Sequence, residues 1–212
     1  MRINIPIIWL LFIVLIVGSC IPSGPDDVTK LDFIYSNHNP EYDFGQGETF
    51  ALPQNIVILR DVPPVPGQMP PTVDFVVSQN ILDAISFNMT SRGFRQVSQF
   101  NDPDYIILPT LSESGTLSFN YDWWFWDWWV PNLGYGLSVQ YPNFNPARIT
   151  SVNTGTILLQ MLDMKNAVPN QPLTVNWIAA LNGALTGSQS NNASRAVSGI
   201  NQAFTQSPFL KK

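Results

Sequence analysis

The chain has 212 residues, a formal net charge of −5 at pH 7, and charged side chains at only 12% of its positions, about half the usual share. Ten lysines and arginines against fifteen acidic residues leave no basic surface for a phosphate backbone, so nucleic-acid binding is disfavoured. A single cysteine, Cys20, excludes a disulfide within the chain and the common cysteine-rich zinc patterns.

Residues 1–19 have the sequence of an export signal. Arg2 gives a positive start, an apolar run from Ile5 to Val17 follows with Pro6 inside it, and small residues come next. A membrane-spanning helix needs about 20 apolar residues. This shorter run therefore predicts a cleaved signal rather than a transmembrane anchor.

The end of that run, Val17-Gly18-Ser19-Cys20, resembles the lipobox of bacterial lipoproteins. The resemblance implies cleavage before Cys20 and diacylation of its thiol. A lone cysteine in an exported protein could instead stay free or pair with another chain, but the position directly after the apolar run favours lipidation. We therefore expect a lipid-anchored protein of the bacterial cell envelope, at the outer membrane, with residues 20–30 as a flexible tether.

Residues 31–212 are long enough for one domain with a sizeable core. Their first half predicts strands at residues 32–35 and 55–60, a loop at 38–48 and a proline-rich connector at 61–71. A helix should follow. Its signals are Thr72 as N-cap, Asp74 in the first turn, apolar residues at helical spacing from Val77 to Met89, and Gly93 as the stop.

The second half predicts strands at residues 104–108, 116–121, 155–163 and 173–180, then a final helix from about Ala193 that ends before Pro208. Strands in succession between two helices favour one sheet with the helices stacked on it. The predicted fold class is therefore α+β, a mostly antiparallel sheet with two helices packed on one face.

The order of several short motifs resembles a known family. The motifs are the lipobox, an early Asp-Phe strand, Arg92-Gly93-Phe94 before Asp102-Pro-Asp-Tyr105, the apolar strand 155–163, Val175-Asn-Trp177, and a closing helix that runs into Ser207-Pro-Phe209. Together they look like the bacterial lipoprotein family called domain of unknown function 4136, over nearly all of the mature chain. The resemblance implies an envelope lipoprotein with an α+β fold and supplies no catalytic residues.

Catalytic motifs are scarce. The only histidine, His38, begins a loop that contains Glu41 and Asp43, and no Gly-x-Ser-x-Gly elbow or Gly-x-Gly-x-x-Gly loop occurs. We expect His38 to bond to neighbouring backbone, and we expect no enzyme activity, no cofactor and no metal site. Asp122 and Asp127 are the one carboxylate pair that could serve glycoside or other hydrolysis, which is the alternative function.

Residues 121–148 form an aromatic-rich insertion, and its core is the densest aromatic stretch of the chain. The aromatic stretch consists of six rings and two carboxylates: Trp123, Trp124, Phe125, Trp126, Trp128, Trp129, Asp122 and Asp127. Neither strand nor helix periodicity gives it a polar side. Burial of the six rings would contribute on the order of 20 to 35 kcal/mol as an upper bound, which exceeds the typical net stability of a domain, about 5 to 15 kcal/mol.

Something must therefore cover a good part of these rings. Three covers fit the sequence: the protein itself, with the stretch folded over the sheet as a lid; a membrane or protein partner; or a glycan. The sequence predicts a lipid-anchored envelope protein with a non-enzymatic binding or structural role. Its partners would be the membrane, through the lipid on Cys20, and an envelope protein or glycan, with the aromatic stretch as the candidate binding surface.

Overall fold

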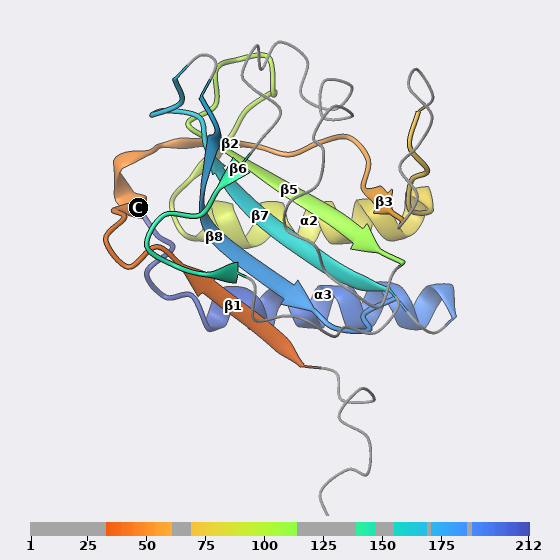
Figure 1. Ribbon diagram of the computed structural model, residues 1–212. Helices are drawn as coiled ribbons and strands as arrows, with labels where there is room; N and C mark the ends of the chain where they lie inside the picture. Colours follow the sequence, from red (N-terminus) through yellow and green to blue (C-terminus); the bar gives the residue numbers. More distant parts are fainter. Residues whose placement is uncertain (1–32, 61–68, 114–138, 147–154, 169–170, 186–187) are drawn as a thin grey trace, which may run out of the picture. The chain divides into compact units, whose positions relative to one another are not determined.

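A sheet flanked by two helices makes up the part of the chain that the computed structural model describes, residues 33–60, 69–113, 139–146, 155–168, 171–185 and 188–212 (Figure 1). Eight strands form the sheet: β1 (Ile34–His38), β2 (Thr49–Ala51), β3 (Val57–Leu59), β4 (Arg95–Gln96), β5 (Tyr105–Ser112), β6 (Val139–Gln140), β7 (Thr156–Asp163) and β8 (Leu173–Leu181). Their order is β1-β8-β7-β5-β2-β4, while β3 pairs with β5 and β6 pairs with β8.

The sheet is mixed, so the prediction of a mostly antiparallel sheet was wrong. Long antiparallel ladders join β5 to β7, β7 to β8 and β8 to β1, but β2 with β4, β2 with β5, β3 with β5 and β6 with β8 are parallel. The helix between β3 and β5 explains much of this. A helical crossover carries the chain back to the end of the sheet at which the previous strand began, so strands joined in that way run parallel.

Both helices, α2 (Phe75–Ser91) and α3 (Gln189–Thr205), pack on one face of the sheet, and Figure 1 shows them behind it. The side chains that alternate toward this face include Ile107 of β5, Leu159 of β7 and Trp177 of β8, all fully buried. Period-two alternation is what a strand requires to face one core. The main core therefore lies between the helix pair and the four long strands.

The opposite face of the sheet is apolar as well. Leu108, Leu158 and Ile178 point to this side and are buried, and partly buried Tyr141 and Phe144 of the segment 139–146 pack against the same cluster. Strands β5 and β7 are consequently buried at every position. Burial on both faces explains why the central parts of these two strands are runs of apolar residues rather than alternating ones.

The helix starts differ from those predicted. Asp74, not Thr72, is the N-cap of α2, and its carboxylate accepts hydrogen bonds from the backbone N–H of Val76 (3.0 Å) and Val77 (3.3 Å). Thr72 is extended and forms a β-bridge with Val57. Helix α3 begins at Gln189, four residues before the predicted start at Ala193. The prediction missed this first turn because its residues are polar and show no apolar period. Among the described residues, neither helix has the length and apolarity needed to cross a bilayer.

Candidate functional site

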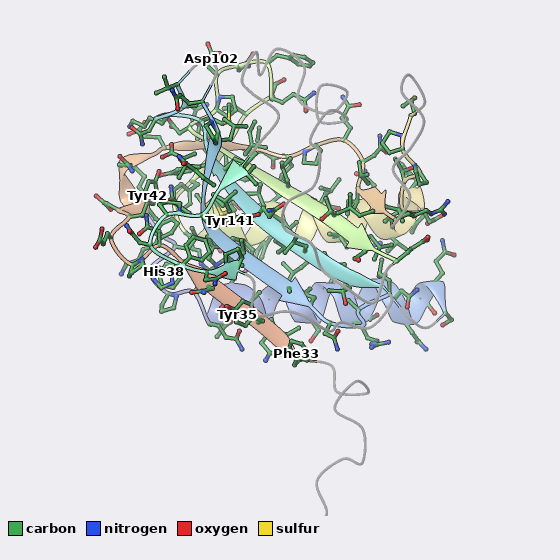
Figure 2. The ribbon with its side chains drawn as sticks, viewed as in Figure 1. Phe33, Tyr35, His38, Tyr42, Asp102 and Tyr141 are labelled. Atoms are coloured by element: carbon green, nitrogen blue, oxygen red, sulfur yellow. The ribbon has the colours of Figure 1, made fainter. Side chains whose placement is uncertain are left out.

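Polar side chains gather at the end of the sheet where β1 and β7 finish and β8 begins. They form two networks. The asparagine cluster consists of Asn39, Glu41, Asn143 and Asn176, and the tyrosine–aspartate network consists of Tyr42, Tyr105, Asp163 and Asn166. Figure 2 shows His38 near the end of β1 and Tyr42 in the loop that follows it. Both networks involve this β1–β2 loop, residues 39–48.

The asparagine cluster joins three segments that are far apart in the sequence. Asn39 donates from its Nδ2 to Oδ1 of Asn176 (3.1 Å), and Asn143 donates from its Nδ2 to Oε2 of Glu41 (2.8 Å) and to Oδ1 of Asn39 (3.3 Å). The backbone N–H of Glu41 donates to the same Oδ1 of Asn39 (3.1 Å). Asn39 and Asn176 are buried, whereas Glu41 and Asn143 are exposed. The cluster is thus a buried amide pair with an exposed amide–carboxylate pair above it.

A bulge in β8 positions Asn176. Met161 of β7 lies opposite Trp177, and the next residue, Leu162, lies opposite Val175, so Asn176 is an extra residue without a partner on β7. A bulge redirects the side chain at which it occurs. Its carbonyl still continues the sheet, because it accepts a hydrogen bond from the N–H of Asn39 (2.9 Å).

Two features of the asparagine cluster cost stability. Nδ2 of Asn176 is buried and has no hydrogen-bond acceptor, which costs about 1 to 3 kcal/mol for an amide. Asn143 has a φ of 60°, in the left-handed region, where a residue with a Cβ pays about 1 to 2 kcal/mol, although asparagine tolerates it better than most. Unpaired buried groups and unusual backbone conformations are concentrated at functional sites.

Aromatic rings lie beside the asparagine cluster. Tyr141 and Phe144, on either side of Asn143 in sequence, pack edge to face with centroids 5.7 Å apart, and both are partly exposed. The hydroxyl of Tyr141 accepts a hydrogen bond from Nε2 of Gln160 (2.5 Å), and burial raises the pKa of Tyr141 well above its ordinary value. On β1, the Tyr35 hydroxyl accepts from Nδ2 of Asn37 (3.0 Å). Amides, one carboxylate and partly exposed rings therefore share this corner.

The tyrosine–aspartate network holds the β1–β2 loop against the sheet. Tyr42 donates its hydroxyl proton to Oδ2 of Asp163 (2.9 Å), and Asn166 donates to both carboxylate oxygens, from its N–H (3.0 Å) and from Nδ2 (2.8 Å). Tyr105, the cross-strand neighbour of Asp163, donates to the carbonyl of Phe44 (2.9 Å) and accepts from the N–H of Gly47 (3.0 Å). These groups satisfy one another, which indicates a structural role.

Replacement of Tyr42 by phenylalanine should change how stability depends on alkaline pH. Burial, first of all, raises the pKa of Tyr42 far above its ordinary value of 10. The folded protein then keeps this proton while the unfolded chain loses it, so stability is full below pH 10 and falls as the pH rises above that value. One tyrosine contributes a slope of up to about 1.4 kcal/mol per pH unit.

Urea unfolding at pH 8, 10 and 11 measures this effect. Tyr42→Phe should lose stability at pH 8, because Asp163 loses a donor, and its stability should then fall less steeply from pH 10 to 11 than that of the wild type. Tyr105 and Tyr141, whose pKa values are also raised by burial, retain the remaining slope. Equal slopes in the two proteins would contradict a buried, neutral Tyr42.

His38 is the last residue of β1 and pairs with Trp177, so the prediction of a loop histidine was wrong. Its ring stacks on Phe209, near the end of the chain, with centroids 3.6 Å apart and an interplanar angle of 19°. Phe44 lies 6.2 Å from it. Burial lowers the pKa of His38. The histidine serves as one ring of an aromatic cluster that fixes the C-terminal residues.

The predicted lipidation site and the predicted binding surface lie outside the described part of the chain. These are Cys20, Asp122, Trp123, Trp124, Phe125, Trp126, Asp127, Trp128 and Trp129. Of the insertion predicted at 121–148, the structure describes residues 139–146, which contribute β6 and the rings of Tyr141 and Phe144. Within the described residues, no group of three or more His, Cys, Asp or Glu side chains could hold a metal ion.

Comparison with known proteins now places the chain. The family model named domain of unknown function (DUF4136) matches residues 34–209, which include every strand and helix described above. The chain belongs to the DUF4136 family. This confirms the resemblance drawn from the order of the motifs.

Solved structures similar to this DUF4136 chain include a protein of the same family from Bacteroides thetaiotaomicron. It is 26% identical, covers 85% of this chain and 97% of its own, and has a TM-score of 0.66. The PelC dodecamer from Paraburkholderia phytofirmans is 11% identical over 86% of this chain and 99% of its own, with a TM-score of 0.40. No curated protein matches the chain significantly.

Sequence reasoning on this DUF4136 chain missed the asparagine cluster. Its members are spread over a turn after β1, a turn after β6 and a bulge in β8. The available signals were Asn39-Pro40 and Pro142-Asn143, which are common turn pairs, and Glu41 beside the first of them. Neither signal shows that the two turns meet, because that depends on the pairing of β1 and β6 with β8.

Proposed function

We propose that this protein is a lipid-anchored component of the bacterial cell envelope, at the outer membrane, and that its domain binds a partner or supports an assembly without a catalytic step. The observation that carries the anchor is the sequence Val17-Gly18-Ser19-Cys20 at the end of a short apolar run. Membership of the DUF4136 family is consistent with it and assigns no activity.

The polar groups of the domain support a binding or structural role over catalysis. A catalytic base needs an unoccupied proton-accepting position and a reacting group within about 3 Å. Asp163, the most buried carboxylate at the candidate site, accepts from Tyr42 and Asn166, so its oxygens are engaged in holding the fold. The exposed and partly exposed side chains at the same corner are an amide, two rings and the carboxylate of Glu41, which accepts a hydrogen bond from Asn143; such groups suit the binding of a partner.

The aromatic stretch is a second contact surface in this proposal. Six rings between Trp123 and Trp129 need a cover, and a membrane, an envelope protein or a glycan would each provide one from outside the chain. Its two carboxylates, Asp122 and Asp127, would then orient the partner. No observation on the described residues favours hydrolysis by this pair.

Replacement of Cys20 by alanine should abolish lipid attachment. Cells that express the chain are grown with an alkyne-tagged palmitate, and the purified protein is examined for label and intact mass. The wild type should carry the label and begin at Cys20, because cleavage and acylation both require that thiol, while Cys20→Ala should be unlabelled and keep residues 1–19. Label on Cys20→Ala, or an unlabelled wild type, would overturn the anchor.

A further inference from the structure

We propose that the asparagine cluster and the rings beside it, Tyr141 and Phe144, form a binding subsite for an uncharged glycan. This inference rests on the proposed binding role and names the class of partner. The site lies at the corner of the sheet where the turn after β1 meets the turn after β6, and its exposed members are Glu41 and Asn143.

The cluster is an ordered, hydrogen-bonded arrangement rather than a group of separately solvated side chains. Four side chains from three segments converge through three side-chain hydrogen bonds and one from the backbone N–H of Glu41, at 2.8 to 3.3 Å. A bulge in β8 sets Asn176 in place, and a left-handed backbone sets Asn143. The amide nitrogen of Asn176, which is 2% exposed, has no acceptor. The unpaired amide nitrogen and the left-handed backbone both lower stability. Such costs are concentrated at functional sites, and their presence in one cluster favours a binding role.

The chemistry of the exposed groups fits hydroxyls. Glu41 accepts hydrogen bonds, Asn143 can both accept and donate, and a sugar with neighbouring hydroxyls offers both functions at once. An anionic ligand would be repelled by Glu41, the only charged member of the cluster. A calcium ion would need about six to eight oxygen ligands, and one carboxylate with three amide oxygens falls short of that number.

The rings supply the apolar half of the recognition. Tyr141 and Phe144 lie within two residues of Asn143 in the sequence, pack edge to face on each other and are partly exposed. The apolar C–H faces of a pyranose can pack on such rings while its hydroxyls reach the amide and the carboxylate.

Titration calorimetry of the full chain in detergent tests the inference. The probes are four neutral oligosaccharides: N-acetylchitotetraose, cellotetraose, maltotetraose and isomaltotetraose. The wild type should bind at least one of them, and Asn143→Gly and Glu41→Gln should each raise the dissociation constant at least tenfold. Glycine is the right replacement at Asn143, because it removes the amide and keeps the left-handed backbone without strain.

Two controls separate this site from others. Asp83→Asn, an exposed carboxylate change on α2, should leave the affinity unchanged. A triple replacement of Trp124, Trp126 and Trp128 by alanine tests the aromatic stretch. The inference is overturned if no probe binds, or if binding survives both cluster variants, whether or not the triple replacement removes it. Lipid label on Cys20 does not depend on either result, so the anchor can stand when the glycan site fails.

Discussion

Replacement of Gly155 by alanine is expected to lower the free energy of unfolding by about 2 to 5 kcal/mol. Gly155 precedes β7 with a φ of 83°, and an added Cβ would lie 2.6 Å from the carbonyl oxygen of Leu185 and 2.8 Å from its carbon. Those atoms are backbone, and they are held in place because the N–H of Leu185 donates to the carbonyl of Gly155 (2.9 Å). The conformational and steric costs therefore add.

Gly93→Ala is the matched control, and urea unfolding of both variants is the measurement. Gly93 also has a positive φ, 94°, but its Cβ would meet only the Cβ of Lys212, at 3.3 Å. That atom belongs to an exposed terminal residue that can move, so only the conformational cost of about 1 to 2 kcal/mol is expected. A loss at Gly155 no larger than the loss at Gly93 would show that Leu185 gives way.

Deletion of the C-terminal residues 207–212 should cost about 4 to 7 kcal/mol, a loss comparable with the stability of many domains. Leu210 is fully buried, and the ring of Phe209 stacks on His38. Ser207 accepts a hydrogen bond from Nε1 of Trp177 (2.9 Å), so the deletion also leaves a buried indole N–H without a partner. Thermal unfolding followed by circular dichroism should show a much lower midpoint or no transition.

Removal of Lys212 alone tests which part of the segment matters. Lys212 donates its N–H to the carbonyl of Arg92 and forms an exposed ion pair with Glu48 (3.0 Å). Exposed pairs contribute little, so this shorter deletion should cost about 1 kcal/mol. If both deletions have the same small effect, the packing of Leu210 and Phe209 does not hold the fold together as described.

The long elements were predictable because their apolar residues form runs or recur at a regular spacing in the sequence. Residues 155–163 and 173–180 are β7 and β8 within one residue at each end, and α2 follows the apolar spacing from Val77 to Met89. Strands β2, β4 and β6 have only two or three residues and carry no period to detect. Their parallel pairings, together with that of β3 with β5, make the sheet mixed.

Strand β5 illustrates a limit of a different kind. The prediction ended it at Leu108, and Pro109 cannot donate to a sheet ladder. In the structure β5 continues to Ser112, and Pro109 lies between the positions that pair with β2 and those that pair with β3. A proline is tolerated where a neighbouring ladder is interrupted, and that interruption is a property of the whole sheet rather than of the strand.

The candidate site was beyond sequence reasoning for the same reason. The sequence indicated the aromatic stretch, because five of the seven tryptophans lie between Trp123 and Trp129. The asparagine cluster consists of ordinary turn residues that acquire meaning only when β8 brings Asn39 and Asn176 together across 137 positions. A bulge of one residue in β8, which decides where Asn176 points, leaves no mark in the sequence.

The placement of the two ends of the domain has a consequence for how the chain is made. The first strand, β1, pairs with β8, and the loop after it packs on Phe209, so the earliest part of the domain finds its partners only when the last part exists. A chain that is still being synthesised or threaded through a membrane lacks those partners. It should therefore stay unfolded until the segments that complete the sheet are available, which would suit the export proposed above.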